Sequence, residues 1–210
     1  MSGGVKYLRR QGRLGAVFYL CKHNNLNAVK NLYADTPEFE IIAVRDGLQA
    51  DEVAEQWKGE KLKIGFEKMQ NWHDFDVEFY RILGVNFKER WDSFSIKRNF
   101  QEEKKLLNEI NLPERFAFVH DDPLRGYIIS ENLIDPSLPI VKPFLSNNFF
   151  DWIAVLERAT EIHCICSSFR LLTDSLPQIN ADLFYHYTYV NGGKPREASV
   201  TVSRKQWKLL

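Results

Sequence analysis

The chain has 210 residues, of which 44% are hydrophobic and 27% charged, so it can bury a core in one large domain or in two smaller halves. Its 28 Lys and Arg residues balance its 28 Asp and Glu residues, which gives a formal net charge of zero. Proteins that bind nucleic acid depend mainly on an excess of Lys and Arg, so this balance argues against nucleic acid as a general partner.

The cysteines and the apolar runs indicate the compartment. Three cysteines, Cys21, Cys164 and Cys166, are too few for a disulfide framework, and a zinc site would need a second Cys or His pair. We interpret Cys164 and Cys166 as buried thiols of a reducing compartment. The start of the chain lacks the apolar core of a signal peptide, and no apolar run is long enough to span a membrane. The sequence therefore predicts a cytoplasmic protein without a transmembrane segment.

Short apolar runs alternate with helical patterns in the first part of the chain. Strands and helices that alternate with short connections are typical of βαβ units around a parallel sheet. The expected strands are residues 15–21, 39–44 and 62–66, and the expected helices are residues 24–33 and 50–57.

Residues 71–111 have a different character, because they are rich in aromatic and charged side chains and contain no clear strand. We interpret this stretch as helices that bridge two halves of the protein, ending in a charged helix over residues 99–110. Its aromatic side chains are expected to pack against the sheet. The chain therefore divides into an N-terminal α/β half with its helical bridge, residues 1–98, and a C-terminal Rossmann-like half, residues 99–210.

The alternation of strands and helices resumes after residue 114. Asn148 is placed to cap a helix, and Pro177 ends another. The overall pattern predicts an α/β fold with Rossmann-like parallel sheets. In this half the expected strands are residues 115–120, 139–142, 161–166 and 182–187, and the expected helices are residues 148–159 and 168–176.

Polar side chains follow each expected strand of the second half. Ligands bind where the carboxyl ends of parallel strands meet, so these side chains form the candidate site. Ser167 and Ser168 link a strand to a helix, where free backbone N–H groups and the helix dipole suit a phosphate, although serine is also simply a good N-cap. His120 and Arg125 offer a base and a guanidinium fork, and Lys142 follows the neighbouring strand.

Other candidates have simpler alternatives. Asp121 and Asp122 precede Pro123 in an ordinary turn sequence, and His163 lies inside a strand beside Glu161, where we interpret it as a satisfied core residue. His23 follows the first strand, where it contacts an acceptor or merely caps a helix.

The second half is similar to the donor-nucleotide half of GT-B glycosyltransferases, such as heptosyltransferases and fucosyltransferase-like bacterial or viral proteins. The resemblance lies in FVHDDPLRG (residues 118–126) and in DWIAVLERATEIHCICSSFRLLTDSL (residues 151–176). It extends over residues 115–187 and more weakly over residues 4–66. It implies a reduced GT-B arrangement of two βαβ halves, with the acceptor bound by the first half and the nucleotide sugar by the second.

The resemblance also implies a reaction and roles for the candidate residues. A sugar would pass from a nucleotide sugar to an unknown glycan or lipid-linked acceptor, without an obligatory metal and with no cofactor beyond the nucleotide-sugar substrate. His120 or His23 would act as the base. The implied contacts to the donor phosphates are Ser167, Ser168, Phe169, Arg125 and Lys142.

The chain departs from the family pattern at its start. GT-B proteins usually open with a strand and a glycine-rich turn, whereas here Gly3 and Gly4 stand directly before the helix-like residues 5–10. We therefore expect a truncated or reduced acceptor half. Two alternatives stay open: a non-catalytic nucleotide- or glycan-binding module, and a metal-dependent transferase that uses Asp121 and Asp122. The second is less favoured, because adjacent carboxylates usually diverge.

Overall fold

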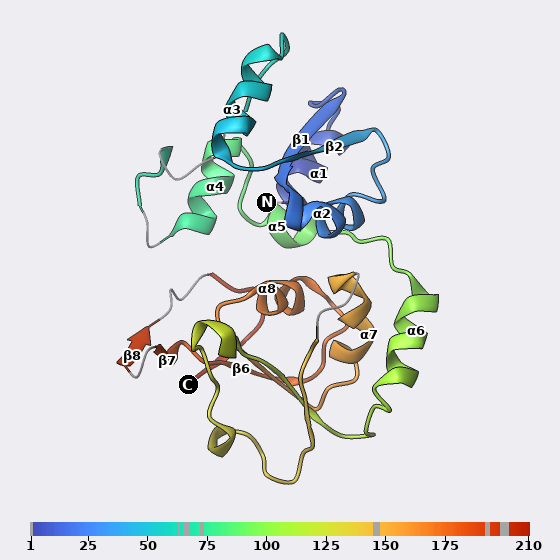
Figure 1. Cartoon of the computed structure of the whole chain (residues 1–210), viewed down its shortest axis with the longest axis vertical. Coiled ribbons are helices and arrows are strands. Elements are labelled where there is room, and N and C mark those ends of the chain that lie inside the picture. Colours follow the sequence, from blue (N-terminus) through green and yellow to red (C-terminus); the bar gives the residue numbers. More distant parts are fainter. Residues whose placement is uncertain are drawn as a thin grey trace. The chain divides into compact units, whose positions relative to one another are not determined.

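A computed structural model shows a mixed α/β protein with parallel sheets, as the sequence predicts (Figure 1). It describes residues 2–62, 64, 68–71, 74–144, 148–191, 194–197 and 202–210. The chain forms two compact units. Unit 1 comprises Met1–Arg98 and Asn147–Phe150, and unit 2 comprises Asn99–Ser146 and Asp151–Leu210.

Unit 1 is built around two parallel strands, β1 (Val17–Lys22) and β2 (Phe39–Val44). The connection between them contains the 3-10 turn η1 (His23–Asn25) and helix α2 (Leu26–Leu32). Side chains alternate along a strand, so one face of the pair packs on α2 and contributes to the core of the unit. The core side chains of this face and of α2 include Val17, Tyr19, Phe39, Ile41, Val29 and Leu32.

The other α-helices of the described part of unit 1 pack around this core or flank it. Helix α3 (Gly47–Gln56) starts three residues earlier than expected, because Asp46 caps it by accepting a hydrogen bond from the backbone N–H of Gln49 at 3.0 Å. The strand expected over residues 62–66 falls mostly outside the described residues, and Leu62 and Ile64, which are described, are not in a strand. The helices are α1 (Ser2–Arg10), α3 (Gly47–Gln56), α4 (Phe75–Leu83) and α5 (Glu89–Asp92).

Gly3 and Gly4 lie inside α1, so the expectation that they precede the first helix is wrong. Both are buried where α1 packs on other helices of the unit. A Cβ atom on Gly3 would collide with the backbone carbonyl of Glu89, and one on Gly4 would lie 2.6 Å from Cδ2 of Leu83. The two glycines therefore permit a close helix contact and do not form a phosphate-binding turn.

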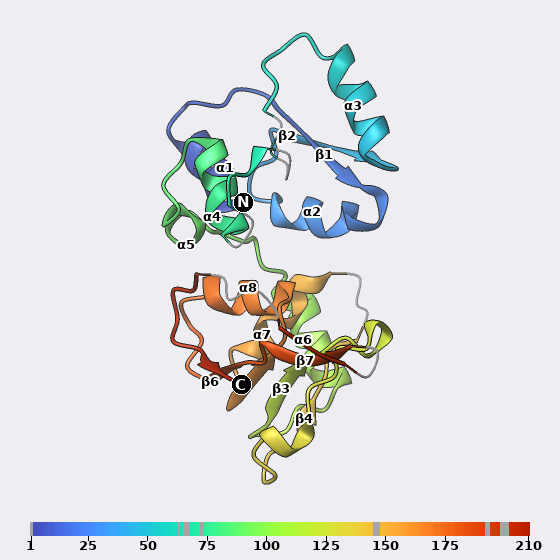
Figure 2. The ribbon, with the colours of Figure 1, turned by 90° about the vertical axis from the view of Figure 1, so that its left-hand side faces the viewer.

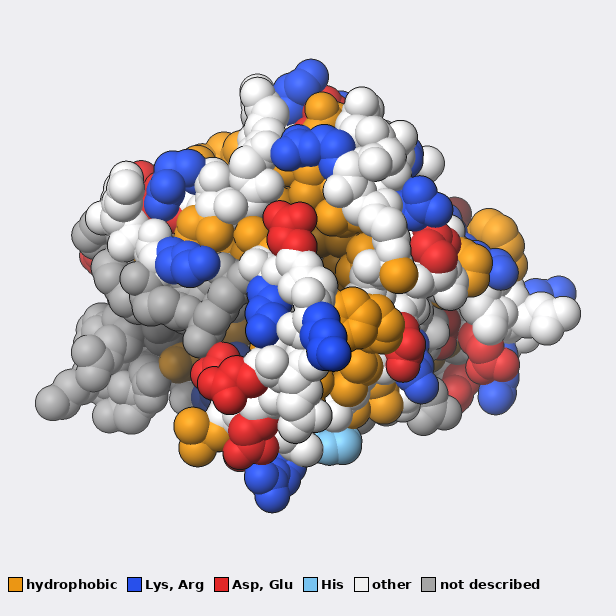
Figure 3. Space-filling model, turned by 90° about the horizontal axis from the view of Figure 1, so that it is seen from above, with side chains coloured by type: hydrophobic (Ala, Val, Ile, Leu, Met, Phe, Trp, Pro, Cys, Tyr) orange, Lys and Arg blue, Asp and Glu red, His pale blue; other side chains and the backbone are white. Residues whose placement is uncertain are grey.

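The face of unit 1 seen in Figure 3 exposes hydrophobic side chains among charged ones. Leu48 of α3 and Leu62 are 75% and 53% exposed, and Trp57 packs its ring 4.2 Å from that of Phe18. Scattered exposed apolar side chains of this kind are common on protein surfaces.

Unit 2 contains a five-stranded, fully parallel sheet in the order β4-β3-β5-β6-β9. A separate antiparallel hairpin pairs β7 (Thr188–Asn191) with β8 (Lys194–Glu197). The strands of the sheet are β3 (Ala117–His120), β4 (Ile140–Val141), β5 (Glu161–Cys164), β6 (Asp182–Tyr185) and β9 (Lys208–Leu209), and the helices are α6 (Phe100–Glu109), α7 (Ile153–Leu156) and α8 (Ser168–Ser175).

The helix expected over residues 148–159 is shorter than predicted. Asn148 accepts a hydrogen bond from the backbone N–H of Phe150 at 3.2 Å, as a cap would. The next residues form the 3-10 turn η5 (Phe149–Trp152), and only Ile153–Leu156 is α-helical. Bulky aromatic residues have lower helix propensity, which is in keeping with the tighter turn.

The two faces of this sheet are covered by different segments (Figure 2). The ring of Phe118 of β3 lies 6.1 Å from that of Trp152 and 5.2 Å from that of Phe169, which places it under η5 and α8. Ala117 and Val119 face the other side, where they pack on the connection from β3 to β4 through Ile129, Ile134 and Leu138.

The C-terminal segment is fixed to α8. Asp174, which is buried, accepts hydrogen bonds from the backbone N–H groups of Arg204 and Lys205 and from Nε1 of Trp207. Arg170 donates to Oγ of Ser203 at 2.6 Å. These contacts bring residues 208–209 alongside β6 as strand β9, which the sequence pattern did not predict.

Candidate functional site

The strand order places a switch point at the carboxyl ends of β3 and β5. These strands are neighbours, but the chain leaves β3 toward β4 on one side and leaves β5 toward β6 on the other. Loops that depart in opposite directions open a crevice, and ligands of parallel α/β sheets bind there. We call this edge, at His120 of β3 and Cys164 of β5, the switch edge; the two residues are paired in register.

Ser167 caps α8 at the switch edge. It is extended, with φ −152° and ψ 168°, and its Oγ accepts a hydrogen bond from the backbone N–H of Arg170 at 3.4 Å. Ser168 is the first residue of the helix and is exposed. The N–H groups of a first helical turn have no partner inside the helix, and they lie at its positive end. This helix start therefore has the geometry and the electrostatics that favour an anion.

His120 lies against the same helix turn. Its ring centroid is 4.7 Å from that of Phe169, and its backbone carbonyl accepts a hydrogen bond from the N–H of Ile165. Burial lowers the pKa of His120, despite the nearby carboxylates of Asp121 and Asp122. Its Nδ1 atom is buried and has no hydrogen-bond partner among the described residues. The imidazole is thus held neutral, with one nitrogen unused.

The two cations that the sequence assigns to phosphates are held by the aspartates of the β3 loop. Lys142 binds Oδ2 of Asp121 at 2.8 Å, and the Nε of Arg125 binds Oδ2 of Asp122 at 2.6 Å. The side-chain hydrogen bond from Arg125 lowers the pKa of Asp122. The neighbouring carboxylates therefore bind different cations. Among the described residues, no group of three His, Cys, Asp or Glu side chains is arranged to hold a metal ion.

The other residues of the sequence prediction lie elsewhere. Phe169 is 7% exposed, and its ring packs between Phe118 of the core and His120, so it supports the switch edge from within. His23 is exposed and belongs to unit 1, where it follows β1. Cys166 is exposed, so the expectation of a buried thiol is wrong there, whereas Cys164 is buried as expected. Unit 2 thus brings together His120, Ser167 and Ser168, with Arg125 and Lys142 in the flanking loops.

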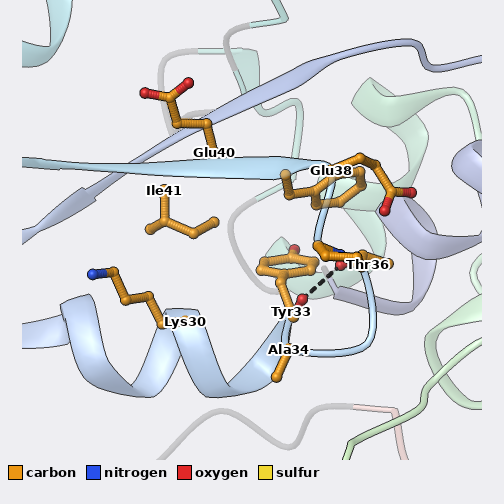
Figure 4. A pocket seen from close by; sticks show the side chains of 9 residues that line it. Lys30, Tyr33, Ala34, Thr36, Glu38, Glu40 and Ile41 are labelled. Carbon is orange, nitrogen blue, oxygen red and sulfur yellow. Dashed lines mark hydrogen bonds between the residues drawn. The ribbon is translucent and has the colours of Figure 1, made fainter.

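A hollow of about 670 Å³ lies in unit 1, away from the carboxyl ends of its strands. It is formed by the end of α2, the start of β2 and the loop between them (Figure 4). Thr36 donates a hydrogen bond to the backbone carbonyl of Tyr33 at 2.9 Å, Glu38 is bound by Arg9, and Glu40 points away from Tyr33. The polar groups of the loop are engaged with the protein itself.

A second cluster of titratable groups, Glu161, His163 and His186, lies in the sheet of unit 2, and the sequence analysis did not predict it as a cluster. His163, expected to be a satisfied core residue, is hydrogen-bonded to both Glu161 and His186. The spacing of Glu161 and His163 in a strand puts both on one face, which was visible in the sequence. The contact with His186 could not be predicted from the sequence, because it depends on the register of β5 and β6.

No protein-family model, curated protein or solved structure matches the chain. Within the described part of the chain, no helix has the length and apolar character needed to cross a membrane.

Proposed function

We propose that the switch edge binds the diphosphate of a nucleotide sugar and that the protein transfers the sugar to a hydroxyl group of a glycan or lipid-linked acceptor. The observation that supports this most directly is the contact between His120 and the first turn of α8, 4.7 Å between ring centroids. It places a neutral imidazole beside a serine-capped helix start, at the edge where parallel α/β sheets bind ligands.

Each group has a role in this reaction. The N–H of Ser168 and the positive end of α8 bind the diphosphate and stabilise the charge that grows on it as the sugar leaves. The neutral His120 accepts a proton or a hydrogen bond from the incoming ligand. Arg125 sits in an exposed ion pair, which exchanges partners at low cost because water screens it. Lys142 is 40% exposed, but its partner Asp121 is only 4% exposed, so Lys142 would contact the phosphates while it stays bound to Asp121.

The likeness of residues 118–126 and 151–176 to the donor half of GT-B glycosyltransferases supports the same reading. That family needs a base for the acceptor hydroxyl and dipoles or cations for the departing nucleoside diphosphate. The GT-B arrangement of two halves is part of the proposal, with unit 2 as the nucleotide-sugar side and unit 1 as the acceptor side.

Calorimetry with UDP-, GDP- and ADP-sugars, with and without magnesium, tests the binding step. One of these ligands should bind without magnesium, and Arg125→Ala should weaken it about tenfold or more, because a hydrogen bond to a charged group contributes about 1.5–3 kcal/mol. Arg158→Ala is the matched control, since Arg158 is exposed and precedes β5 at the opposite edge of the sheet. If no nucleotide sugar binds, the proposal fails.

A non-catalytic nucleotide- or glycan-binding module is the second candidate. It is favoured by the burial of His120, the candidate base of unit 2, because the Nδ1 atom of its ring is buried. Release of nucleoside diphosphate in the presence of acceptor glycans separates the two functions. Binding without any release supports the module, and release that is lost in His120→Asn supports the transferase.

A further inference from the structure

Three buried or half-buried side chains form a continuous hydrogen-bonded row in the sheet of unit 2. His163 is fully buried, and its Nε2 lies 3.0 Å from Oε2 of Glu161. Its Nδ1 lies 3.0 Å from Nε2 of His186, which is 2% exposed. The His163 ring is stacked on Phe184, with centroids 4.4 Å apart and an interplanar angle of 6°. Both imidazoles are therefore fixed in position and orientation.

The carboxylate sets the tautomer of every ring in the row. A carboxylate only accepts hydrogen bonds, so the proton of His163 must be on Nε2, facing Glu161. The Nδ1 of His163 is then an acceptor, and His186 must donate to it from Nε2. This leaves the Nδ1 of His186 without a proton. The chain of three groups thus ends in a hydrogen-bond acceptor.

The row runs along the strand direction, from the amino ends of the strands to their carboxyl ends. Glu161 is the first residue of β5 and pairs with Asp182, the first residue of β6. His186 follows Tyr185, the last residue of β6, and its backbone N–H bonds to the carbonyl of Cys164 at the switch edge. His163 pairs in register with Val119, so the row lies on the face opposite α8.

We propose that Glu161, His163 and His186 form a proton relay that ends at Nδ1 of His186, one residue beyond the carboxyl end of β6. A hydroxyl group or water there gives its proton to Nδ1 of His186, and the Nε2 proton of His186 passes to Nδ1 of His163. The Nε2 proton of His163 then passes to Oε2 of Glu161. One proton enters at His186 and one arrives at Glu161. The same transfers in reverse return a proton from Glu161 through both rings to the group at Nδ1 of His186, which restores the Nε2–H tautomer of each ring.

The surroundings favour a concerted transfer through neutral rings. Burial lowers the pKa of His163, although Glu161 opposes this, and lowers that of His186 to about 4. On the β6 and β9 side, Lys208 lies 4.8 Å above the ring of Phe184 and pairs with Asp182 at 3.3 Å. On the β3 side the face is apolar. A buried imidazolium is therefore costly, whereas passing the proton along restores a neutral ring at each position.

The source of the incoming proton, the acceptor hydroxyl of a sugar transfer, rests on the proposed function. The tautomers and the movement of the proton do not depend on that function, so they can be tested without any ligand. The competing explanation is a static row in which each histidine merely satisfies the other inside the core.

Nitrogen-15 NMR of the full-length protein distinguishes the two. At pH 7 both His163 and His186 should be neutral with the proton on Nε2, each assigned by loss of its signals in a single substitution. Glu161→Gln keeps an acceptor for His163 but cannot take up a proton. It should preserve both tautomers and slow the exchange of the two ring protons with D₂O at least tenfold.

The control is Glu131→Gln, which removes an exposed carboxylate of the same unit and should leave both exchange rates unchanged. A ring found as the Nδ1–H tautomer or as imidazolium at pH 7 overturns the relay. Equal ring-proton exchange in the wild type and in Glu161→Gln overturns it as well. Neither outcome depends on whether a nucleotide sugar binds, so failure of the relay and failure of the proposed function remain distinct.

Discussion

The buried histidines of unit 2 make its stability depend on pH. Burial lowers the pKa of His186 to about 4, whereas an unfolded histidine titrates near about 6.5. Below that pH the unfolded state binds more protons than the folded state, so stability is lost as the pH falls from 7 toward 4. For His186 alone the loss between pH 7 and pH 5 is about 2 kcal/mol.

Urea unfolding at pH 7 and pH 5, compared between the wild type and His186→Gln, measures this loss. The glutamine amide keeps a donor for His163, so the variant should retain its fold and lose less stability on acidification than the wild type. His23→Gln, at an exposed histidine of unit 1, serves as control and should follow the wild-type pH dependence. Identical pH dependence in wild type and His186→Gln would refute the assignment.

For single residues, the sequence predicts which side chains belong to the candidate site better than it predicts which groups they contact. The serine cap of α8 follows from a local pattern, a strand that runs directly into a helix, so Ser167 is in the predicted place. The ion pairs of Asp121 with Lys142 and of Asp122 with Arg125 depend on loop geometry. The link from His163 to His186 joins residues 23 positions apart and exists only in one register of β5 and β6. Such contacts leave no local signature.

At the scale of elements, the tight contact of α1 makes a sharp prediction. A methyl group on Gly3 would collide with the backbone carbonyl of Glu89, which cannot move without shifting α5. Gly3→Ala should therefore lower the free energy of unfolding by about 1–3 kcal/mol, although the higher helix propensity of alanine acts in the opposite direction. Gly15→Ala is the control, because a Cβ there meets no atom within 4 Å and the backbone is not left-handed. Urea denaturation should show a loss in the first variant alone.

The anchor of the C-terminal segment can be tested in the same way. Asp174→Ala would leave the N–H groups of Arg204 and Lys205 and the indole N–H of Trp207 without their acceptor. We expect a loss of about 1.5–3 kcal/mol and faster proteolysis within residues 202–210. Glu131→Ala, at an exposed site, should change neither quantity. An unchanged cleavage rate in Asp174→Ala would show that β9 is held by its pairing with β6.

How well an element can be predicted depends on how local its causes are. The strand over residues 39–44 is observed with the predicted ends, and α8 begins at Ser168 as predicted, because an apolar run and a serine cap define them. Strand β9 has only two residues and is positioned by the contacts of Asp174 and Arg170, so no periodic pattern in the sequence predicts it. Of the helix expected over residues 148–159, only Ile153–Leu156 is α-helical, because the preceding residues form the 3-10 turn η5.

At the scale of the whole molecule, the fold class follows from the order of its elements. Alternating strands and helices with short connections favour parallel strands, and the strands are parallel in the β1-β2 pair of unit 1 and in the five-stranded sheet of unit 2. The switch edge is a consequence of strand order, β4-β3-β5, which the sequence does not specify. This strand order brings polar residues that are far apart in the sequence together in one candidate site of unit 2, whereas His23 lies in unit 1.

The location of the site can be tested on the intact chain by hydrogen exchange with a saturating nucleotide sugar. A ligand at 100 times its dissociation constant stabilises the state that binds it by about 2.7 kcal/mol. Amides at the ends of β3 and β5 and in the first turn of α8 should therefore exchange more slowly, while β1 and β2 keep their rates. Protection of Tyr33, Thr36 and Phe39 instead would move the site to the hollow of unit 1. At the same ligand concentration the Arg125→Ala variant should keep only about half of this stabilisation, because a tenfold weaker ligand is then at about 10 times its dissociation constant.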